Sequence, residues 1–241
     1  MRIYDPLIFK IEELFAGITP RKLSLTSSWK EERGKVFVFP EDAALELGGD
    51  EPSSYVIAYT SNPDLVKEDE AELIGEDANT LRGNAPFAHL VFIRLKANTP
   101  ESEQECYRIL RDIEYQRYQV KPQGYMVRVN TNEIKEGGRL SKDATNRGFS
   151  FCDLAASYAQ HYHSNPYVEA VRQIFITDPR FPWAQLKEFA SLNEGITLTL
   201  DHILKTLKMD CRVCSFKSIC DTVEGMREIH QQEKDNDKAN K

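Results

Sequence analysis

The sequence predicts an α+β protein, with helices packed on a mixed or antiparallel sheet and a helical, cysteine-rich metal segment near the C-terminus. Strand and helix patterns are intermixed along the 241 residues, but the connections are irregular and no strand–helix–strand unit repeats. Three of the five cysteines lie within ten residues of one another. We therefore expect an α+β domain over residues 1–209 with its core at 45–180, a metal-binding segment at 210–234, and a flexible charged tail at 235–241.

Composition narrows the class of protein. A 41% hydrophobic content is ordinary for a globular chain, and no apolar run approaches the ~18 residues of a membrane span. The N-terminus lacks the apolar core of a signal peptide. An odd, clustered set of cysteines fits a reducing cytoplasm better than a disulfide framework. The net charge of -7 argues against a non-specific nucleic-acid binder. We expect a cytoplasmic protein without membrane or nucleic-acid partners.

The first half of the chain predicts one helix and several strands. A helix is expected at residues 5–16. Asp5 is a suitable N-cap, Pro6 is favoured in the first turn, and Gly17 is typical of the position at which a helix ends. Runs rich in β-branched, aromatic and aliphatic residues predict strands at 36–39, 55–59, 72–75 and 88–95. The last of these is the most apolar and is expected to be central, with His89 as a hydrogen-bonded core residue.

The second half of the chain predicts mainly helices. Apolar residues at helical spacing, with caps and proline stops, predict helices at 101–116, 153–163, 183–192, 199–208 and 221–234. A short helical turn capped by Ser141 is expected at 141–146. Strands are expected at 125–129 and 171–177.

The most informative motif is the C-x2-C-x5-C run formed by Cys211, Cys214 and Cys220. Two thiolates separated by two residues can face one metal from a single turn, and a third can close over the same centre. Basic neighbours such as Arg212 and Lys217 stabilise thiolates. Three thiolates are one ligand short of a tetrahedral zinc site or a fully protein-ligated 4Fe–4S cluster.

Several groups compete for the fourth position. His230 is a chemically suitable ligand, but on a continuous helix ten residues place it about 15 Å from Cys220, so the helix would have to break at Gly225. Cys152 and Cys106 are distant thiol donors. Water or a partner protein are the remaining candidates.

Four stretches of the middle of the chain carry a family resemblance: Glu46–Gly49, Glu72–Asp77, Arg139–Ala144 with Gly148–Phe151 after it, and Arg172–Asp178. In order and approximate spacing they resemble the acetyl-CoA synthase family, the β subunit of the CO dehydrogenase/acetyl-CoA synthase complex. The resemblance covers about residues 45 to 220. In that family this region is an α+β domain that precedes the nickel-bearing domain.

The resemblance implies an iron–sulfur centre in anaerobic one-carbon or CO metabolism. Cys211 and Cys214 match the first two cluster cysteines of the family. The third comes later than Cys220, and His230 stands where the fourth is found. This sequence ends where the catalytic domain would continue and has no Cys-Gly-Cys for nickel. The expectation is therefore a relative that lacks acetyl-CoA synthesis, binds a 4Fe–4S cluster, and transfers electrons to or docks on a corrinoid protein or CO dehydrogenase component.

Other functions remain open. The same cysteines could hold zinc as the staple of an interaction module. A residual acetyl or carbonyl transferase activity is a further alternative. The cysteine spacing also resembles the 4Fe–4S staple of recombination and CRISPR-associated nucleases, for which Glu133-Ile134-Lys135 would supply an E-x-K tripeptide.

A second candidate site is basic. Arg139, Lys142 and Arg147 surround the predicted helix start at Ser141, where they could bind an anion such as a phosphate of coenzyme A. The alternative is that these three side chains form an ordinary solvated surface.

Overall fold

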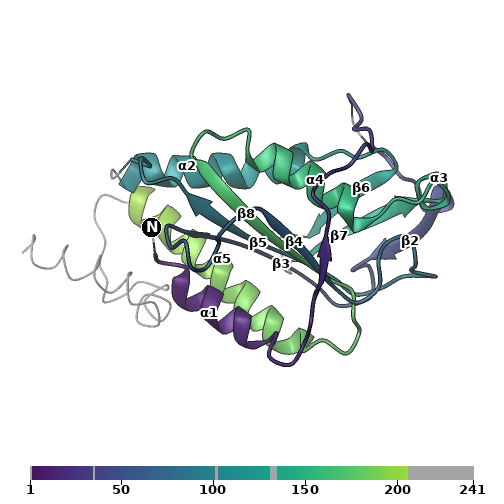
Figure 1. Ribbon diagram of the computed structural model, residues 1–241, viewed down its shortest axis with the longest axis horizontal. Coiled ribbons are helices and arrows are strands. Elements are labelled where there is room, and N and C mark those ends of the chain that lie inside the picture. Colours follow the sequence, from purple (N-terminus) through teal and green to yellow (C-terminus); the bar gives the residue numbers. More distant parts are fainter. Residues whose placement is uncertain (1, 35, 101–102, 131–134, 206–241) are drawn as a thin grey trace, which may run out of the picture.

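A computed structural model of the chain describes residues 2–34, 36–100, 103–130 and 135–205. Three layers form the body of the protein, with a five-stranded sheet between two pairs of helices (Figure 1). One face of this sheet carries α1 (Asp5–Glu13) and α5 (Trp183–Lys205), and the other carries α2 (Glu103–Gln116) and α4 (Phe151–Tyr162). The predicted α+β class with a mixed sheet is confirmed. The expected C-terminal metal segment, including its helix at 221–234, lies outside the described residues.

The five-stranded sheet has the order β1-β4-β8-β5-β3. Its strands are β1 (Arg21–Leu23), β4 (Glu70–Ile74), β8 (Val168–Ile176), β5 (Phe87–Leu95) and β3 (Ser53–Thr60). β3 pairs with β5 and β4 with β8 in parallel, whereas β5 and β8 pair antiparallel. The sheet therefore consists of two parallel strand pairs that are joined edge to edge by the antiparallel pairing of β5 with β8. The short β1 is added antiparallel to β4. β8 is the middle strand, and the expected central strand, β5, is its neighbour.

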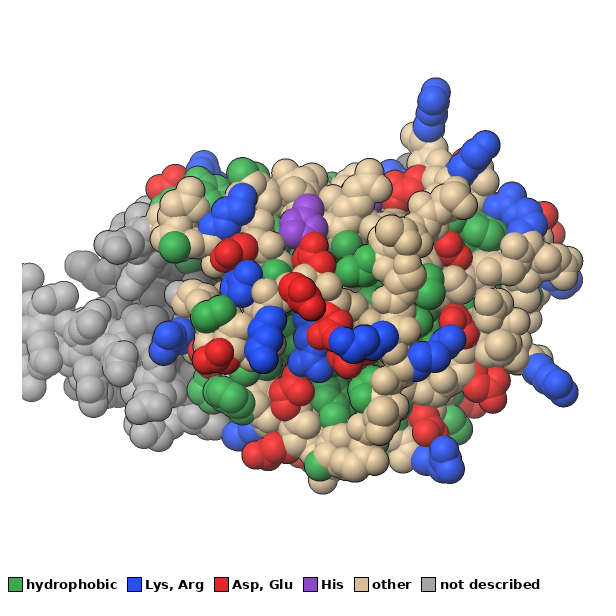
Figure 2. Space-filling view, viewed as in Figure 1, with side chains coloured by type: hydrophobic (Ala, Val, Ile, Leu, Met, Phe, Trp, Pro, Cys, Tyr) green, Lys and Arg blue, Asp and Glu red, His purple; other side chains and the backbone are tan. Residues whose placement is uncertain are grey.

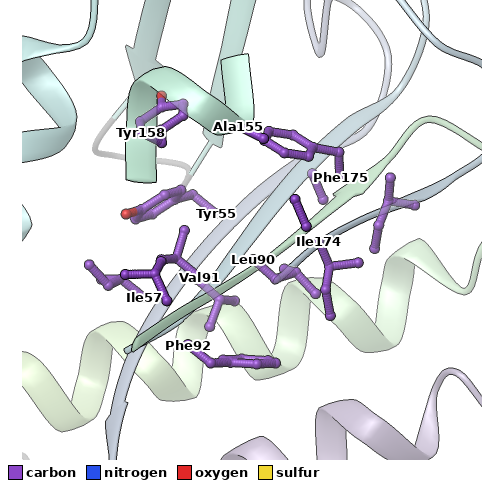
Figure 3. Close-up of a cluster of buried hydrophobic side chains, with 14 of the residues drawn as sticks. Tyr55, Ile57, Leu90, Val91, Phe92, Ala155, Tyr158, Ile174 and Phe175 are labelled. Atoms are coloured by element: carbon purple, nitrogen blue, oxygen red, sulfur yellow. The ribbon is translucent and has the colours of Figure 1, made fainter. Parts of the chain in front are cut away.

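Successive side chains of each strand point to opposite faces of the sheet, so each central strand contributes to the core on both faces. His89 of β5 contacts Tyr158 of α4, and Phe175 of β8 stacks on His89. Leu90 and Phe92 therefore point to the opposite face, toward α5 (Figure 3). Because both faces are covered by helices, nearly every residue of β3, β5 and β8 is buried.

A smaller antiparallel sheet adjoins the first, in the order β2-β7-β6. Its strands are β2 (Ala43–Leu47), β7 (Lys135–Ser141) and β6 (Tyr125–Asn130), and α3 (Lys142–Asn146) follows directly. As predicted, Ser141 caps α3, with its hydroxyl accepting the Ala144 N–H at 3.1 Å. Gly148 follows the helix with φ of 85°.

One predicted strand is absent and three strands were missed. Residues 36–39 pair with no strand of the described chain, although their composition favours one. A short 3₁₀ helix at Pro40–Asp42 follows them, and the missed β2 comes next. The missed strands β1, β2 and β7 are short or contain alanines, charges and glycines, so their composition gives little indication of a strand.

Helix α1 begins at residue 5 as predicted, but its N-cap is Tyr4 and not Asp5. Asp5 is its first helical residue and is buried against the core. This burial raises the pKa of the Asp5 carboxyl, with opposing contributions from Thr60 and Arg2. The helix ends at Glu13, three residues before the predicted end, and turns continue from Leu14 to Gly17, which has φ of 81°.

One continuous helix replaces the two predicted at residues 183–192 and 199–208. Asn193 and Gly195 suggest a break, but the carboxamide of Asn193 points into the core instead of interrupting the helix. Its oxygen accepts the Ile57 N–H at 3.2 Å, and its nitrogen donates to the Ile57 carbonyl at 2.9 Å. Asn193 therefore satisfies backbone groups on the edge strand β3 that have no strand partner there.

The surface in Figure 2 carries Lys and Arg side chains intermingled with Asp and Glu, without one dominant sign. In the part of the chain that the structure describes, no helix has the length and apolar composition needed to cross a membrane.

We predict that Asn193→Ala destabilises the fold by about 1–3 kcal/mol, because it leaves two buried backbone groups of Ile57 without partners. Urea denaturation followed by circular dichroism measures the change. Ser191→Ala, at an exposed site of the same helix, is the matched control and should change the unfolding free energy by less than ~0.5 kcal/mol. Equal effects of the two substitutions would contradict this role of Asn193.

Candidate functional site

The structure locates only part of the predicted metal site. Cys211, Cys214, Cys220 and His230 lie outside the described residues, so their ligation stays a prediction. Glu133 and Ile134 of the E-x-K tripeptide also lie outside them. The described chain reaches Lys205, the last residue of α5, six positions before Cys211 in the sequence.

The two remaining cysteines lie on different helices over the same face of the sheet. Cys152, at the start of α4, is partly buried and packs against the hydrophobic core. Cys106 is buried on α2, and this burial raises the pKa of its thiol. Among the described residues, no three His, Cys, Asp or Glu side chains are grouped so as to hold a metal ion.

Arg139 lies on β7 and pairs with the opposite residue on β2, Glu46. Its Nε donates to Glu46 Oε1 at 2.7 Å, and its Nη1 donates to the Val38 carbonyl at 2.9 Å. Arg128 of β6 donates to the other oxygen of Glu46 at 2.6 Å. An anion that binds Arg139 would therefore have to compete with Glu46.

Lys142 and Arg147 lie at the two ends of α3. The Lys142 ammonium donates to the Glu41 carbonyl at 2.7 Å. Arg147 lies 3.5 Å from Asp143 and places its guanidinium 4.5 Å from the centre of the Trp29 ring. The structure brings Arg139, Lys142 and Arg147 into one region, but each already has a partner within the protein.

A buried charged cluster, which the sequence does not reveal, lies between the two sheets. It contains Glu136 of β7, His89 of β5, and Arg117 from the short 3₁₀ helix Arg117–Gln119 that follows α2. Glu136 is 1% exposed, His89 0% and Arg117 7%. Arg117 Nη1 lies 3.4 Å from Glu136 Oε2, and His89 Nδ1 lies 3.7 Å from Glu136 Oε1.

Tyrosines enclose this cluster. Tyr158 of α4 donates to Glu136 Oε1 at 3.2 Å, and Arg117 lies 4.0 Å from the ring centre of Tyr55 on β3. Figure 3 shows Tyr55 and Tyr158 on the same side of the sheet. Burial, reinforced by the charge of Glu136, holds the pKa of Tyr158 well above its usual value. Burial disfavours the charge of Arg117, but Tyr55 and Glu136 outweigh it and raise the pKa of the guanidinium.

Of the two ring nitrogens of His89, Nε2 is hydrogen-bonded, whereas the buried Nδ1 has no hydrogen-bond partner among the described residues. His89 Nε2 lies 3.3 Å from Gln173 Oε1 on β8, and the Gln173 amide donates to the Ala155 carbonyl of α4 at 2.9 Å. The expectation that His89 is a hydrogen-bonded core residue is confirmed. The cluster thus links the middle of the large sheet to α4 on one side and to β7 on the other.

Two glycines after Glu136 allow this close packing. A Cβ at Gly137 would lie 2.2 Å from the Leu47 carbonyl oxygen, and one at Gly138 would lie 2.4 Å from the Tyr125 ring. The run Lys135-Glu136-Gly137-Gly138 is the one sequence signal for the cluster, because adjacent glycines in a strand indicate close approach of other groups. With Glu136, His89 and Arg117 all nearly inaccessible, the arrangement can fix the two sheets together.

Two histidines at the end of α4 pair with carboxylates at the surface. His161 lies 3.0 Å from Glu31, and His163 lies 2.9 Å from Asp69, which also accepts the Val171 N–H. The hydrogen bond to Asp69 raises the pKa of His163, against a smaller effect of burial. Burial would raise the pKa of Asp69, but the hydrogen bonds from His163 and Val171 lower it overall.

No protein-family model matches the sequence, and no curated protein sequence matches it either.

We predict that Glu136→Leu destabilises the protein by about 3–5 kcal/mol, because it leaves Arg117 buried without its carboxylate. Adding Arg117→Met should recover part of that loss, giving a positive coupling energy in a double-mutant cycle measured by chemical denaturation. Glu105 and Arg108, an exposed pair at 3.8 Å on α2, form the control cycle, with expected coupling below ~0.5 kcal/mol. Additive losses at Glu136 and Arg117 would refute the proposed link.

We also predict a pH-dependent contribution from His163 and Asp69. Because the pKa of His163 is raised on folding, its contribution to the unfolding free energy is fully present at a pH below 6.5, the usual pKa of histidine. The contribution is lost as the pH rises through the raised pKa. A lowered pKa of Asp69 gives stability that is present above 3.8 and lost as the pH falls through the lowered value. The pair should therefore stabilise most between these limits.

The test compares the wild type with Asp69→Asn, which keeps an acceptor for the Val171 N–H. Because both side chains are partly exposed, the difference in unfolding free energy should be about 0.2–1 kcal/mol at about pH 5.5 and smaller at about pH 8.5. Asp64→Asn, at an exposed position nearby in the sequence, should show no such pH dependence. A larger difference at the higher pH would contradict the assignment.

Proposed function

We propose that the protein is an iron–sulfur protein of anaerobic one-carbon or CO metabolism, related to acetyl-CoA synthase, that acts in the cytoplasm. Its role would be electron transfer or docking to a corrinoid protein or CO dehydrogenase component. The observation that carries the proposal is the C-x2-C-x5-C spacing of Cys211, Cys214 and Cys220. These thiolates suit the cluster chemically, and His230, Cys152, water or a partner protein would supply the fourth ligand.

The arrangement of the four family-like stretches supports the proposal. They are far apart in sequence but adjacent in pairs in space. Glu46–Gly49 lies at the end of β2, beside β7, which carries the start of Arg139–Ala144. Glu72–Asp77 begins within β4, whose parallel neighbour β8 carries most of Arg172–Asp178. A resemblance that arose by chance would not be expected to fall on two pairs of neighbouring strands.

An ion pair connects the members of each pair of stretches. Glu46 accepts from Arg139 at 2.7 Å, and Glu72 accepts from Arg172 at 2.7 Å. Both arginines are mostly buried, so each interaction is better shielded from water than an ordinary surface pair. The residues that carry the resemblance therefore include complementary charges that hold this fold together, which is what inheritance of a common fold would preserve.

A second candidate rests on the donor set. Three cysteines and one histidine form a common ligand set for structural zinc, so the same segment could be the zinc staple of an interaction module. Residual acetyl or carbonyl transfer lacks a comparable observation, because the sequence contains no Cys-Gly-Cys.

We predict that anaerobically purified full-length protein is brown and contains iron and acid-labile sulfide. Cys214→Ser should lose most of the metal, because a thiolate ligand is removed, while Cys106→Ala should keep it. Elemental analysis, sulfide determination and circular dichroism of each variant are the measurements. Colourless protein with one zinc per chain would support the second candidate, and a chain with neither metal would refute both.

A further inference from the structure

Residues 36–39, Val-Phe-Val-Phe, form an extended segment with two exposed aromatic side chains. Phe37 is 64% exposed and Phe39 is 61% exposed, whereas Val38 between them is 4% exposed. This is the alternation of a strand with one face on the protein and the other in water. The segment leads into the 3₁₀ helix at Pro40–Asp42, and Phe39 has extended, polyproline II-like dihedrals of φ -69° and ψ 156°.

The backbone of the segment has an inner edge bound to the protein and an outer edge that is open at Phe37, although the Phe39 carbonyl accepts the Asp42 N–H at 3.1 Å. Arg139 donates to the Val38 carbonyl at 2.9 Å, which fastens the inner edge to β7. In an extended chain the backbone groups of Phe37 point the opposite way. No hydrogen bond from the described residues reaches the N–H or C=O of Phe37. An open hollow of about 640 Å³ borders Val36, Phe37 and Val38.

The segment therefore has a strand's composition and an extended conformation at Phe39, without a neighbouring strand among the described residues. Free backbone groups beside exposed phenylalanines provide both hydrogen bonds and apolar contacts to a second extended chain. The charged residues on either side of the segment indicate the identity of this second extended chain. Arg33 and Lys35 precede it, and Glu41 and Asp42 follow it. Arg33, Glu41 and Asp42 are exposed.

We infer that residues 36–39 pair antiparallel with the same residues of a second copy of this chain. Antiparallel pairing brings the basic flank of each copy to the acidic flank of the other, whereas parallel pairing would bring like charges together. Pairing through the open edge of Phe37 satisfies its backbone groups and covers the phenylalanines of both copies. The resulting two-fold contact is self-complementary and closes at two chains. This inference does not depend on the proposed metal centre.

The first experiment measures the association of the full chain by sedimentation equilibrium at low salt, over about 10 to 500 µM. A monomer–dimer equilibrium is expected. The variant Phe37→Ser with Phe39→Ser should remain monomeric, since it removes the exposed aromatic surface without touching the core. Phe9→Ser, at a 53% exposed phenylalanine on α1, is the matched control and should associate like the wild type. A monomeric wild type, or a dimer that survives loss of Phe37 and Phe39, would overturn the inference.

A charge exchange tests the orientation. One variant carries Arg33→Glu and Lys35→Glu, and a second carries Glu41→Lys and Asp42→Lys. Each alone should raise the dissociation constant by about 2- to 30-fold, since each symmetric dimer then loses its exposed ion pairs. An equimolar mixture of the two should recover association near the wild-type level, because opposite charges then face each other again. No recovery on mixing would refute the antiparallel arrangement.

Discussion

The antiparallel pairing of β5 with β8 is the contact on which the rest of the fold depends. Each of these strands has its own parallel neighbour, so their pairing joins two half-sheets into one. Both strands are covered on both faces, by α4 on one side and α5 on the other. A polar side chain there is costly unless it is hydrogen-bonded, and this cost explains why His89 and Gln173, which face α4, bond to each other.

The second sheet is attached through a charge instead of an apolar surface alone. Glu136 comes from β7 and finds its partners on β5, on α4 and at the end of α2. A buried carboxylate with these partners is costly to separate from them, whereas an apolar contact of the same area would tolerate sliding. The ion pair of Glu46 with Arg139 joins β7 to its other neighbour, β2, and holds β2 in register.

The sequence predicted those elements whose signals are local. The helices with proline or glycine boundaries, the cap at Ser141, and the apolar strands β3, β5 and β8 all follow from short-range patterns. The wrong predictions concern segments whose conformation depends on contacts with residues far away in the sequence. Residues 36–39 have a strand's composition but no strand beside them, while β7 contains two glycines and is a strand because Leu47 and Tyr125 pack against it. The break between helices expected near Asn193 is absent, because the Asn193 side chain hydrogen-bonds to the backbone of Ile57 instead of interrupting the helix.

The same distinction applies to the candidate sites. The C-x2-C-x5-C motif is contained in ten residues, so it can be recognised without any knowledge of the fold. The cluster around Glu136 draws its members from separate elements, and only the two glycines after Glu136 give a local indication of it. The partners of Arg139 and Lys142 also come from residues 38–46, which only folding brings near them.

Asn193 also fixes the direction in which the chain leaves the body of the protein. Its two bonds to Ile57 set the rotation and axial position of α5 against β3. Twelve residues of rigid helix, about 18 Å, then separate this anchor from Lys205. Along this length Thr197 bonds to Tyr4 and Asp201 to Tyr107 of α2, so the described end of α5 is tied to the helices on both faces of the sheet as well as to the sheet edge.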